Sequence, residues 1–430
     1  MADYIPSTLQ FLSSSRQCEL KSLNYLLESG ELVGKVSTLV HFLQRERGAV
    51  NLFLCHNEPY SSSDLDDSKQ NALWHQQQFL DHLHASQLHS LTQPQMGKLF
   101  YSIARAIYAL GALQESRAAI ANKEMPVDQA VETFNDTIQH LLILVFTITD
   151  TSADPTISRA LIALFSLMQG KELAGQERAI GVRIFSNGQG GKKVQHLAQQ
   201  IADLIERQEH YFSTFFEFSD ESTQQRWSAI AVDPEFEQLR RVACTHGRVP
   251  RIHQASQHWF SLATQRMDTF KQLEDTLQHA LMELCRQRMA NTLHAFDAQQ
   301  TDIEQLKTAL SHRDEGYSVF MAHPLGEAPM HNGWLTSEGV PPQLGQSLLT
   351  LLRVQSQRLE EQNQELIELR EVLEQRKIID RAKNLLMEYR QLSENEAYKT
   401  LRQMAMDQNK KMVEISSALL SVADVFHSTC

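Results

Sequence analysis

Apolar residues recur at helical spacing along most of the chain, from about Leu32 to Leu310. Spacings of three and four residues place apolar side chains on one face of an α-helix. Short polar stretches interrupt the pattern and predict where each helix ends. They lie near Asn57–Ser68, Gln93–Gln95, Asn122–Pro126, Asp150–Pro155, Ser186–Gly191, Val232–Pro234 and Thr245–Pro250. Long amphipathic helices with short connections predict an all-α protein built from antiparallel helix bundles.

The pattern changes between residues 312 and 345, where Gly and Pro residues are concentrated. Both residue types interrupt regular structure, so this segment is predicted to be a linker between domains. Beyond it, a polar helix carries leucine at every seventh position, at Leu352, Leu359, Leu366 and Leu373. That spacing fits one seam of a parallel dimeric coiled coil. It equally fits a single amphipathic helix on a neighbouring domain, because Ser356 and Arg370 weaken the second seam.

The C-terminal residues predict a small module of three helices. The first helix has an apolar stripe formed by Ile379, Ala382, Leu386 and Met387. Ser393 precedes Glu396 at the spacing of a capping box, which predicts the start of a second helix. A third helix is predicted from roughly Met412 to Phe426.

Composition and charge agree with this division. The 430 residues include only 17 Gly and 11 Pro, which favours helices. The net charge of −12 argues against nucleic-acid binding by the whole surface. Between Arg376 and Lys411, however, nine Lys and Arg residues stand against five Asp and Glu residues, so the rest of the chain carries −16. An acidic body is therefore joined to a basic C-terminal module.

Several classes of protein are excluded by missing features. The longest apolar runs, Leu141–Ile148 and Ala160–Met168, are shorter than the roughly 20 residues of a membrane-spanning helix. The first ten residues lack the basic start and apolar core of a secretory signal. Five scattered cysteines without a CxxC or Cys/His cluster favour a cytoplasmic protein. No phosphate-binding loop, HExxH or GxSxG motif is present, so no enzyme, metal site or cofactor is predicted.

The most specific pattern lies in Arg376–Met387 and Ser393–Met406. It has Ala-Lys in the first helix, followed by Glu-Ala-Tyr, Leu-Arg and Ala-Met in the second. This pattern closely resembles the ANTAR family. The resemblance implies a three-helix module that binds hairpins in leader RNA and prevents formation of a transcription terminator. One difference is Asn384, where the family commonly has Gly.

The ANTAR resemblance also implies which side chains contact RNA. Cations suit phosphates, and an aromatic ring suits stacking on an unpaired base. The predicted RNA-binding residues are Lys383, Arg402, Tyr398, Arg381 and Lys410. The alternative is that the cations form a solvated helix face and the tyrosine belongs to the core.

Two segments of the acidic body resemble each other, Gln44–Ala49 and Gly175–Ile180, each with Glu-Arg followed by a small or apolar residue. Counting in helical steps places Arg47 and Arg178 on the apolar stripes of their helices, whereas Arg45 lies on a different face. A buried arginine without a partner is strongly unfavourable. Either an Asp or Glu from another helix pairs with each arginine, or inward arginines share a small anion through their guanidinium forks.

Together with Leu239-Arg240-Arg241, these segments resemble the NIT nitrate- and nitrite-sensing family over roughly residues 35–290. The resemblance implies two packed four-helix bundles with nitrate between them, bound by arginines. The predicted ligand-binding residues are Arg47, Arg178, Arg240, Arg241 and Arg45. Two choices stay open: the register between Arg240 and Arg241, and whether Arg45 replaces or joins Arg47.

The predicted organisation is a helical lead-in (1–34), a sensor (35–311), a Gly/Pro-rich linker (312–345), a linker helix (346–374) and an ANTAR module (375–430). The NIT and ANTAR resemblances together imply a nitrate- or nitrite-responsive antiterminator for nitrate assimilation genes. Its partners would be a leader mRNA hairpin, transcribing RNA polymerase indirectly and a second copy of the chain, but neither DNA nor a membrane.

The alternative is an RNA-binding or adaptor regulator switched by another anion, a phosphorelay partner or dimerisation. The opposite charges of body and module suggest one hypothesis for the switch. The sensor would mask the face that carries Lys383 and Arg402 until the anion binds.

Overall fold

The computed structural model describes residues 5–55, 62–86, 96–150, 154–186, 192–230, 233–245, 255–310, 317–320, 334–337, 374–387, 389–390, 394–408 and 410–427, with single residues between 360 and 371 and at 392. The chain forms two compact units. One contains Met1–Glu28 and Met282–Leu366, and the other contains Ser29–Leu281 and Ile367–Cys430. All the predicted binding residues lie in the second unit.

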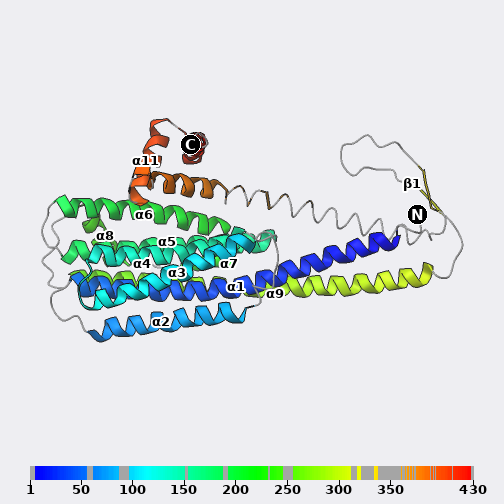
Figure 1. Ribbon diagram of the computed structural model, residues 1–430, viewed down its shortest axis with the longest axis horizontal. Helices are drawn as coiled ribbons and strands as arrows, with labels where there is room; N and C mark the ends of the chain where they lie inside the picture. Colours follow the sequence, from blue (N-terminus) through cyan, green and yellow to red (C-terminus); the bar gives the residue numbers. More distant parts are fainter. Residues whose placement is uncertain are drawn as a thin grey trace. The chain divides into compact units, whose positions relative to one another are not determined.

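Helices dominate the described residues, which confirms the predicted all-α class. They are α1 (Ile5–Cys55), α2 (Ser62–Ala85), α3 (Met96–Ala121), α4 (Val127–Asp150), α5 (Pro155–Ser186), α6 (Lys192–Phe218), α7 (Glu221–Ser228), α8 (Pro234–Thr245) and α9 (Ala255–Leu310). Figure 1 shows α3, α4, α5 and α6 lying alongside one another. Side-chain hydrogen bonds group α1–α4 as one bundle and α5, α6, α8 and α9 as a second.

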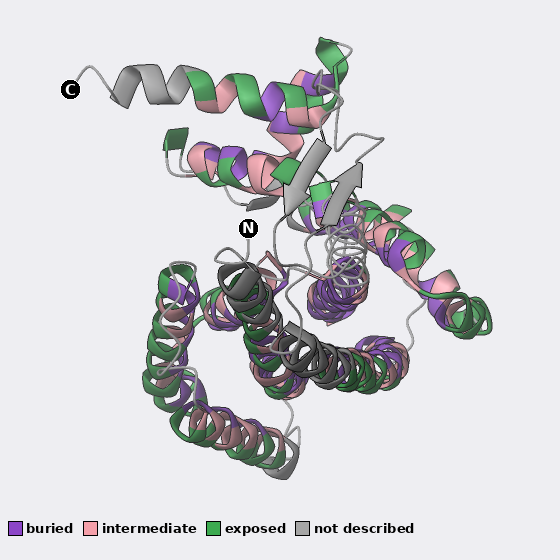
Figure 2. Cartoon of the chain, turned by 90° about the vertical axis from the view of Figure 1, so that its right-hand side faces the viewer, coloured by how far each residue is buried: buried purple, intermediate pink, exposed green. Residues whose placement is uncertain are grey.

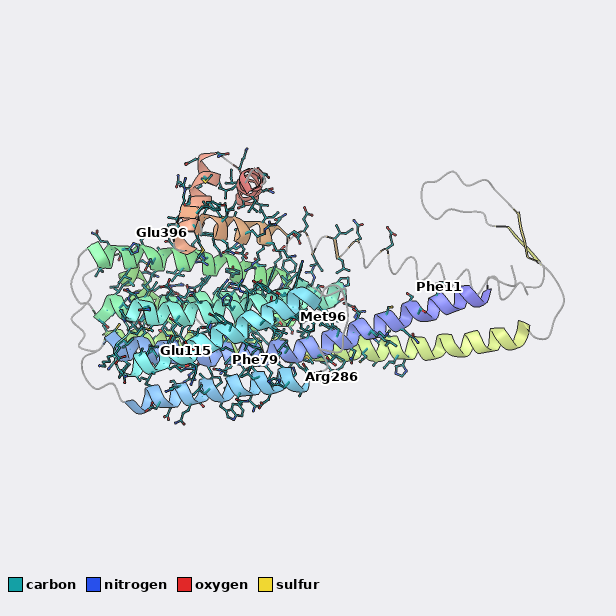
Figure 3. All side chains as sticks on the ribbon, in the orientation of Figure 1. Phe11, Phe79, Met96, Glu115, Arg286 and Glu396 are labelled. Carbon is teal, nitrogen blue, oxygen red and sulfur yellow. The ribbon has the colours of Figure 1, made fainter. Side chains whose placement is uncertain are left out.

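Helix α5 is buried along a continuous stretch from residue 161 to residue 175. A helix buried around its whole circumference lies inside the structure. Its neighbours are amphipathic, as Figure 2 shows from the buried and exposed colours along each helix. Helix α4, for example, buries Phe134, Ile138 and Leu141 on one stripe, and Phe79 of α2, labelled in Figure 3, is fully buried.

Two helices begin at the same local signal, an Asp followed by Pro. Asp154 Oδ1 accepts hydrogen bonds from the amides of Thr156 (2.9 Å) and Ile157 (3.1 Å) at the start of α5. At the start of α8, Asp233 Oδ1 does the same for residues 235 and 236. The carboxylate satisfies free amides, and proline suits the first helical position because it needs no hydrogen-bond partner there.

The C-terminal module has the three predicted helices. They comprise residues 374–387, α11 (Glu394–Asp407) and α12 (Met412–His427). The core of the module consists of Ala382, Leu386, Ala397, Leu401, Ala405 and Ile415. Of the stripe predicted on the first helix, Ala382 and Leu386 belong to this core, Met387 packs against it, and Ile379 is half-buried.

The structure differs from two predictions, one about a break between helices and one about the Gly/Pro-rich linker. Helix α2 begins at Ser62, inside the break predicted at Asn57–Ser68, and the acidic residues of its first two turns favour a helix N-terminus. The Gly/Pro-rich segment contains an antiparallel pair of strands, β1 (Tyr317–Phe320) and β2 (Trp334–Ser337), which the sequence pattern did not predict.

Most of the predicted coiled-coil seam lies outside the described residues. Leu352, Leu359 and Leu373 lie outside the described residues, and Leu366 is described and buried. The coiled coil and the domain boundaries therefore stay predictions.

A candidate anion site between two helix bundles

Arg47 of α1 and Arg178 of α5 point inward, as helical counting predicts. Their exposed fractions are 0% and 1%. Glycines stand where each arginine side chain meets the other helix. A Cβ on Gly48 would lie 2.7 Å from Arg178 Nη2, and a Cβ on Gly175 would lie 2.5 Å from Arg47 Nη2. The glycine of each segment therefore makes room for the arginine of the other.

Arg47 is neutralised by a carboxylate of the opposite helix. Its Nη1 donates to Glu172 Oε1 (2.5 Å) and its Nη2 to Glu172 Oε2 (3.2 Å), and Nη1 also donates to Asn135 (2.5 Å). The amides of Gln44 and Gln176 donate to the same carboxylate, each at 2.9 Å. For Arg47, the simpler of the two predicted partners, an acidic residue from another helix, is the correct one.

Arg178 has a different environment. Its Nη2 donates to the backbone oxygen of Gln44 (2.6 Å), its Nη1 donates to Thr264 Oγ1 (2.9 Å), and its Nε is buried without a hydrogen-bond partner among the described residues. The guanidinium lies 4.9 Å from the centre of the Phe260 ring. No carboxylate of the described residues forms an ion pair with it. Burial, followed by repulsion from Arg47, lowers the pKa of Arg178 to about 9.

A cavity of about 390 Å³ lies beside Arg178. It is lined by Phe42, Arg45, Ala49, Asp67, Ser68, Asn71, Arg178, Phe260 and Thr264. Arg45 is 47% exposed and lies 3.9 Å from Asp268, which also partly offsets the charge of Arg178. Since the pKa of Arg178 remains above neutrality, the cavity holds a buried cation that lacks a direct counter-charge, which is a favourable place for a small anion.

The structure does not bring Arg240 and Arg241 into this cavity. Arg240 Nε donates to Glu177 Oε1 (2.7 Å), and its side chain lines a separate cavity of about 380 Å³ with Arg266. Arg241 is exposed. A ligand contact by either residue stays a prediction that would require the helices to rearrange.

Sequence reasoning missed three residues that shape the site. Glu172 neutralises one arginine, while Thr264 and Phe260 of α9 contact the other. Helical counting identifies the buried face of a helix but not the residue opposite it. No signal in the sequence singled out Thr264 or Phe260, whereas Glu172 could have been noticed as a charged residue within the apolar stretch of α5.

Three of the predicted RNA-binding residues contact other protein groups. Lys383 is only 7% exposed and forms an ion pair with Asp380 of its own helix. The Arg207 guanidinium of α6 lies 5.5 Å from the centre of the Tyr398 ring. Arg402 forms an ion pair with Glu206 of α6. Both remaining residues, Arg381 and Lys410, are exposed.

The close contact between Gly48 of α1 and Arg178 of α5 leads to a testable prediction. Replacing Gly48 with alanine is expected to destabilise the protein by about 1–3 kcal/mol, because the added Cβ overlaps the Arg178 guanidinium and forces it to move. Gly111→Ala on α3 is the control, since a Cβ there meets nothing within 4 Å and alanine favours a helix. Urea unfolding of both variants measures the difference. Equal stability of G48A and wild type would contradict this close contact between Gly48 and Arg178.

The described helices include none that is long and apolar enough to cross a membrane. The sequence matches the NIT family, described as nitrate and nitrite sensing, over residues 38–282. It matches the ANTAR domain over residues 368–420. The nitrate regulatory protein of Klebsiella oxytoca is 31% identical over 430 residues, which cover 100% of this chain and 98% of that protein. The solved structure of the NasR transcription antiterminator matches this chain with a TM-score of 0.59 and 29% sequence identity. The match covers 98% of this chain and 100% of the NasR chain.

Proposed function

Because this chain belongs to the NIT family and carries a C-terminal ANTAR domain, we propose that it is a transcription antiterminator that responds to nitrate or nitrite. Its helical body binds the anion, and its C-terminal module binds a hairpin in leader mRNA. The bound hairpin prevents terminator formation and so derepresses nitrate assimilation genes. RNA polymerase takes part indirectly, through the transcript, and the protein acts in the cytoplasm.

One observation carries the sensing half of this proposal. Arg178 is buried, charged at neutral pH and unpaired with any described carboxylate, and it borders a cavity. A planar oxyanion matches a guanidinium through two parallel hydrogen bonds, and both are strengthened by exclusion from water. We therefore assign Arg178 as the principal anion ligand, with Arg45 at the cavity wall and Arg47, which Glu172 neutralises, as a neighbour.

The proposed response is tested by measuring leader-RNA binding during titration with different anions. Nitrate or nitrite in the millimolar range is expected to raise RNA affinity, whereas chloride and sulfate at matched ionic strength are not. Chloride lacks the planar pair of acceptors, and sulfate carries a second charge that is costly to bury. RNA affinity that ignores nitrate would favour a regulator switched by another signal.

Ion pairs and ring contacts within the second compact unit suggest how the module is kept inactive. Lys377 pairs with Asp150 (2.5 Å) and Lys399 pairs with Asp203 (2.6 Å). Arg376 lies 4.1 Å from the centre of the Tyr211 ring of α6. Basic groups of the module thus contact acidic and aromatic groups of the sensor, as the opposite charges suggest.

Docking of the module would also cover part of its predicted RNA-binding face. Tyr398 and Arg402 contact Arg207 and Glu206 of α6, whereas Lys383 pairs with Asp380 of its own helix and lines a cavity of about 410 Å³ with Tyr398 and Tyr211. Side chains that contact the sensor are not free to contact phosphates or bases. We propose that this docked arrangement is silent toward RNA.

Anion binding can reach the docked face through α6. Glu177, next to Arg178, accepts a hydrogen bond from Gln208 of α6 (2.7 Å). Arg207, which precedes Gln208 in α6, lies over the ring of Tyr398. An anion shifts the equilibrium only if it binds the released arrangement better than the docked one. A small movement of α5 against α6 would supply that difference in affinity.

Dimer formation through the leucine-spaced segment, most of which lies outside the described residues, is a further part of the proposal. The mass of the full chain with and without nitrate tests it and separates a constitutive dimer from one that the ligand induces.

A further inference from the structure

Helix α3 carries a second regular pattern on the face opposite its buried stripe. The buried stripe includes Leu99, Leu110 and Leu113. On the other face, the residues at alternating spacings of four and three are all exposed. They are Gly97, Tyr101, Ala104, Tyr108, Gly111, Glu115 and Ala118, here called the α3 seam. Such a seven-residue repeat is typical of helices that pack side by side. Both faces of α3 therefore have the pattern of a packing face, but the described residues bury only one of them.

The α3 seam exposes large aromatic rings. Tyr101 is 65% exposed and Tyr108 is 81% exposed, and the neighbouring Ile107 is 42% exposed. A single exposed apolar side chain needs no explanation, whereas a row of them on one helix face indicates an interaction surface. The small residues between the rings are open as well, because a Cβ on Gly97 or Gly111 would meet nothing within 4 Å. Large side chains thus alternate with empty space along the seam.

This alternation is self-complementary when a second copy of α3 packs antiparallel against the first. A two-fold axis beside Ala106 brings each tyrosine opposite a small residue. Tyr101 then faces Gly111 of the second copy, and Tyr108 faces Ala104 of the second copy. Antiparallel helices pack in this way, with one seam position of each helix against the other seam position of its partner. Every ring enters a space that the second copy leaves open.

The same arrangement brings opposite charges together. Met96 and Glu115, labelled in Figure 3, lie toward the two ends of α3. In the antiparallel pair, Glu115 lies opposite Gly97 of the second copy, next to Lys98. Two-fold symmetry makes this contact twice. A parallel pair would instead place Glu115 against Glu115 and tyrosine against tyrosine. Because charges at the edge of an interface select orientation, they favour the antiparallel pair.

We propose that the α3 seam is an interface between two copies of this chain, packed antiparallel about Ala106. It goes beyond the proposed function, in which a dimer forms through the leucine-spaced segment, and it needs no bound anion. The cavity beside Arg178 is lined from α1, α2, α5 and α9. Association through α3 therefore leaves the walls of that cavity unchanged and joins two sensors in one assembly.

Sedimentation velocity of the full chain over a range of concentrations tests the interface. Wild type is expected to associate reversibly. Lys98→Glu and Glu115→Lys are each expected to weaken self-association about tenfold, since each change makes two attractive contacts repulsive. The double variant exchanges the signs and is expected to associate like wild type. Contacts elsewhere between copies are the same in all four proteins, so these differences belong to α3.

A second variant tests the aromatic contacts. Tyr108→Ser is expected to weaken self-association at least 100-fold, because both copies lose a ring near the centre of the interface. The residue is exposed, so the fold should be kept, which circular dichroism checks. Trp74→Ser is the control, since it removes a 59% exposed ring from α2 and should associate like wild type. Unfolding of the Gly111→Ala control is measured at low concentration, where the copies are separate.

Three results would overturn the proposal. They are a wild type that stays monomeric at every concentration, single variants that associate as strongly as wild type, and a double charge exchange that does not restore association.

Discussion

Replacing Arg178 with methionine is expected to weaken nitrate binding at least 100-fold. The loss of the guanidinium removes two charge-assisted hydrogen bonds, each contributing about 1.5–3 kcal/mol, and 100-fold corresponds to about 2.7 kcal/mol. The fold should survive, because methionine is flexible and apolar and because the substitution removes a buried cation that lacks a direct counter-charge. Calorimetry gives the affinity, and thermal unfolding without nitrate shows whether stability is kept or raised.

The control for this experiment is Arg183→Met on the same helix. Arg183 pairs with Asp128 and does not line the cavity beside Arg178. Nitrate affinity should therefore stay close to that of wild type. If R178M is folded and binds nitrate as tightly as R183M does, Arg178 is not the ligand.

Reversing the charge of Asp203 and Glu206 together should make RNA binding largely independent of nitrate. Both residues lie on α6 and pair with the module, at Lys399 and Arg402. A single exposed ion pair contributes at most about 1 kcal/mol. Changing both to lysine also adds repulsion, so the double variant is expected to raise RNA affinity without nitrate by tenfold or more, which corresponds to at least about 1.4 kcal/mol.

Fluorescence anisotropy with leader-hairpin RNA measures this effect with and without nitrate. Glu206→Lys and Glu209→Lys form a matched pair, since both change the net charge of α6 by +2 but only the first removes an ion pair with the module. A larger gain for Glu206→Lys separates release of the module from general attraction of RNA. A double variant that stays silent without nitrate would instead favour a mechanism in which the anion positions two modules.

The parts of the fold that sequence predicts well are those decided by local periodicity. Two features were predicted correctly, the stripe of Ala382 and Leu386 in the module and the polar break before Pro155. Both are determined by a few neighbouring residues, which set the buried face of a helix and its N-terminus. The β1–β2 pair was missed because pairing of strands depends on residues far apart and on a short pattern that many loops share.

The candidate site divides in the same way. Helical counting was enough to show that Arg47 and Arg178 are buried. It could not show that one is neutralised by Glu172 and the other is not, because that depends on how α1 and α5 cross. The apparent similarity of the two segments in sequence thus concealed a difference in electrostatics that only the three-dimensional contacts reveal.

The hydrogen bonds that fix Arg178 before any anion arrives set a limit on sensitivity. Nitrate has four non-hydrogen atoms, and very small ligands gain at most about 1.5 kcal/mol per atom, or about 6 kcal/mol in all, which corresponds to a Kd of tens of micromolar. A receptor that had to order a loop around so small a ligand would lose much of that free energy. Here Gln44 and Thr264 already hold the guanidinium, so preorganisation leaves most of the modest binding free energy available to move the helices.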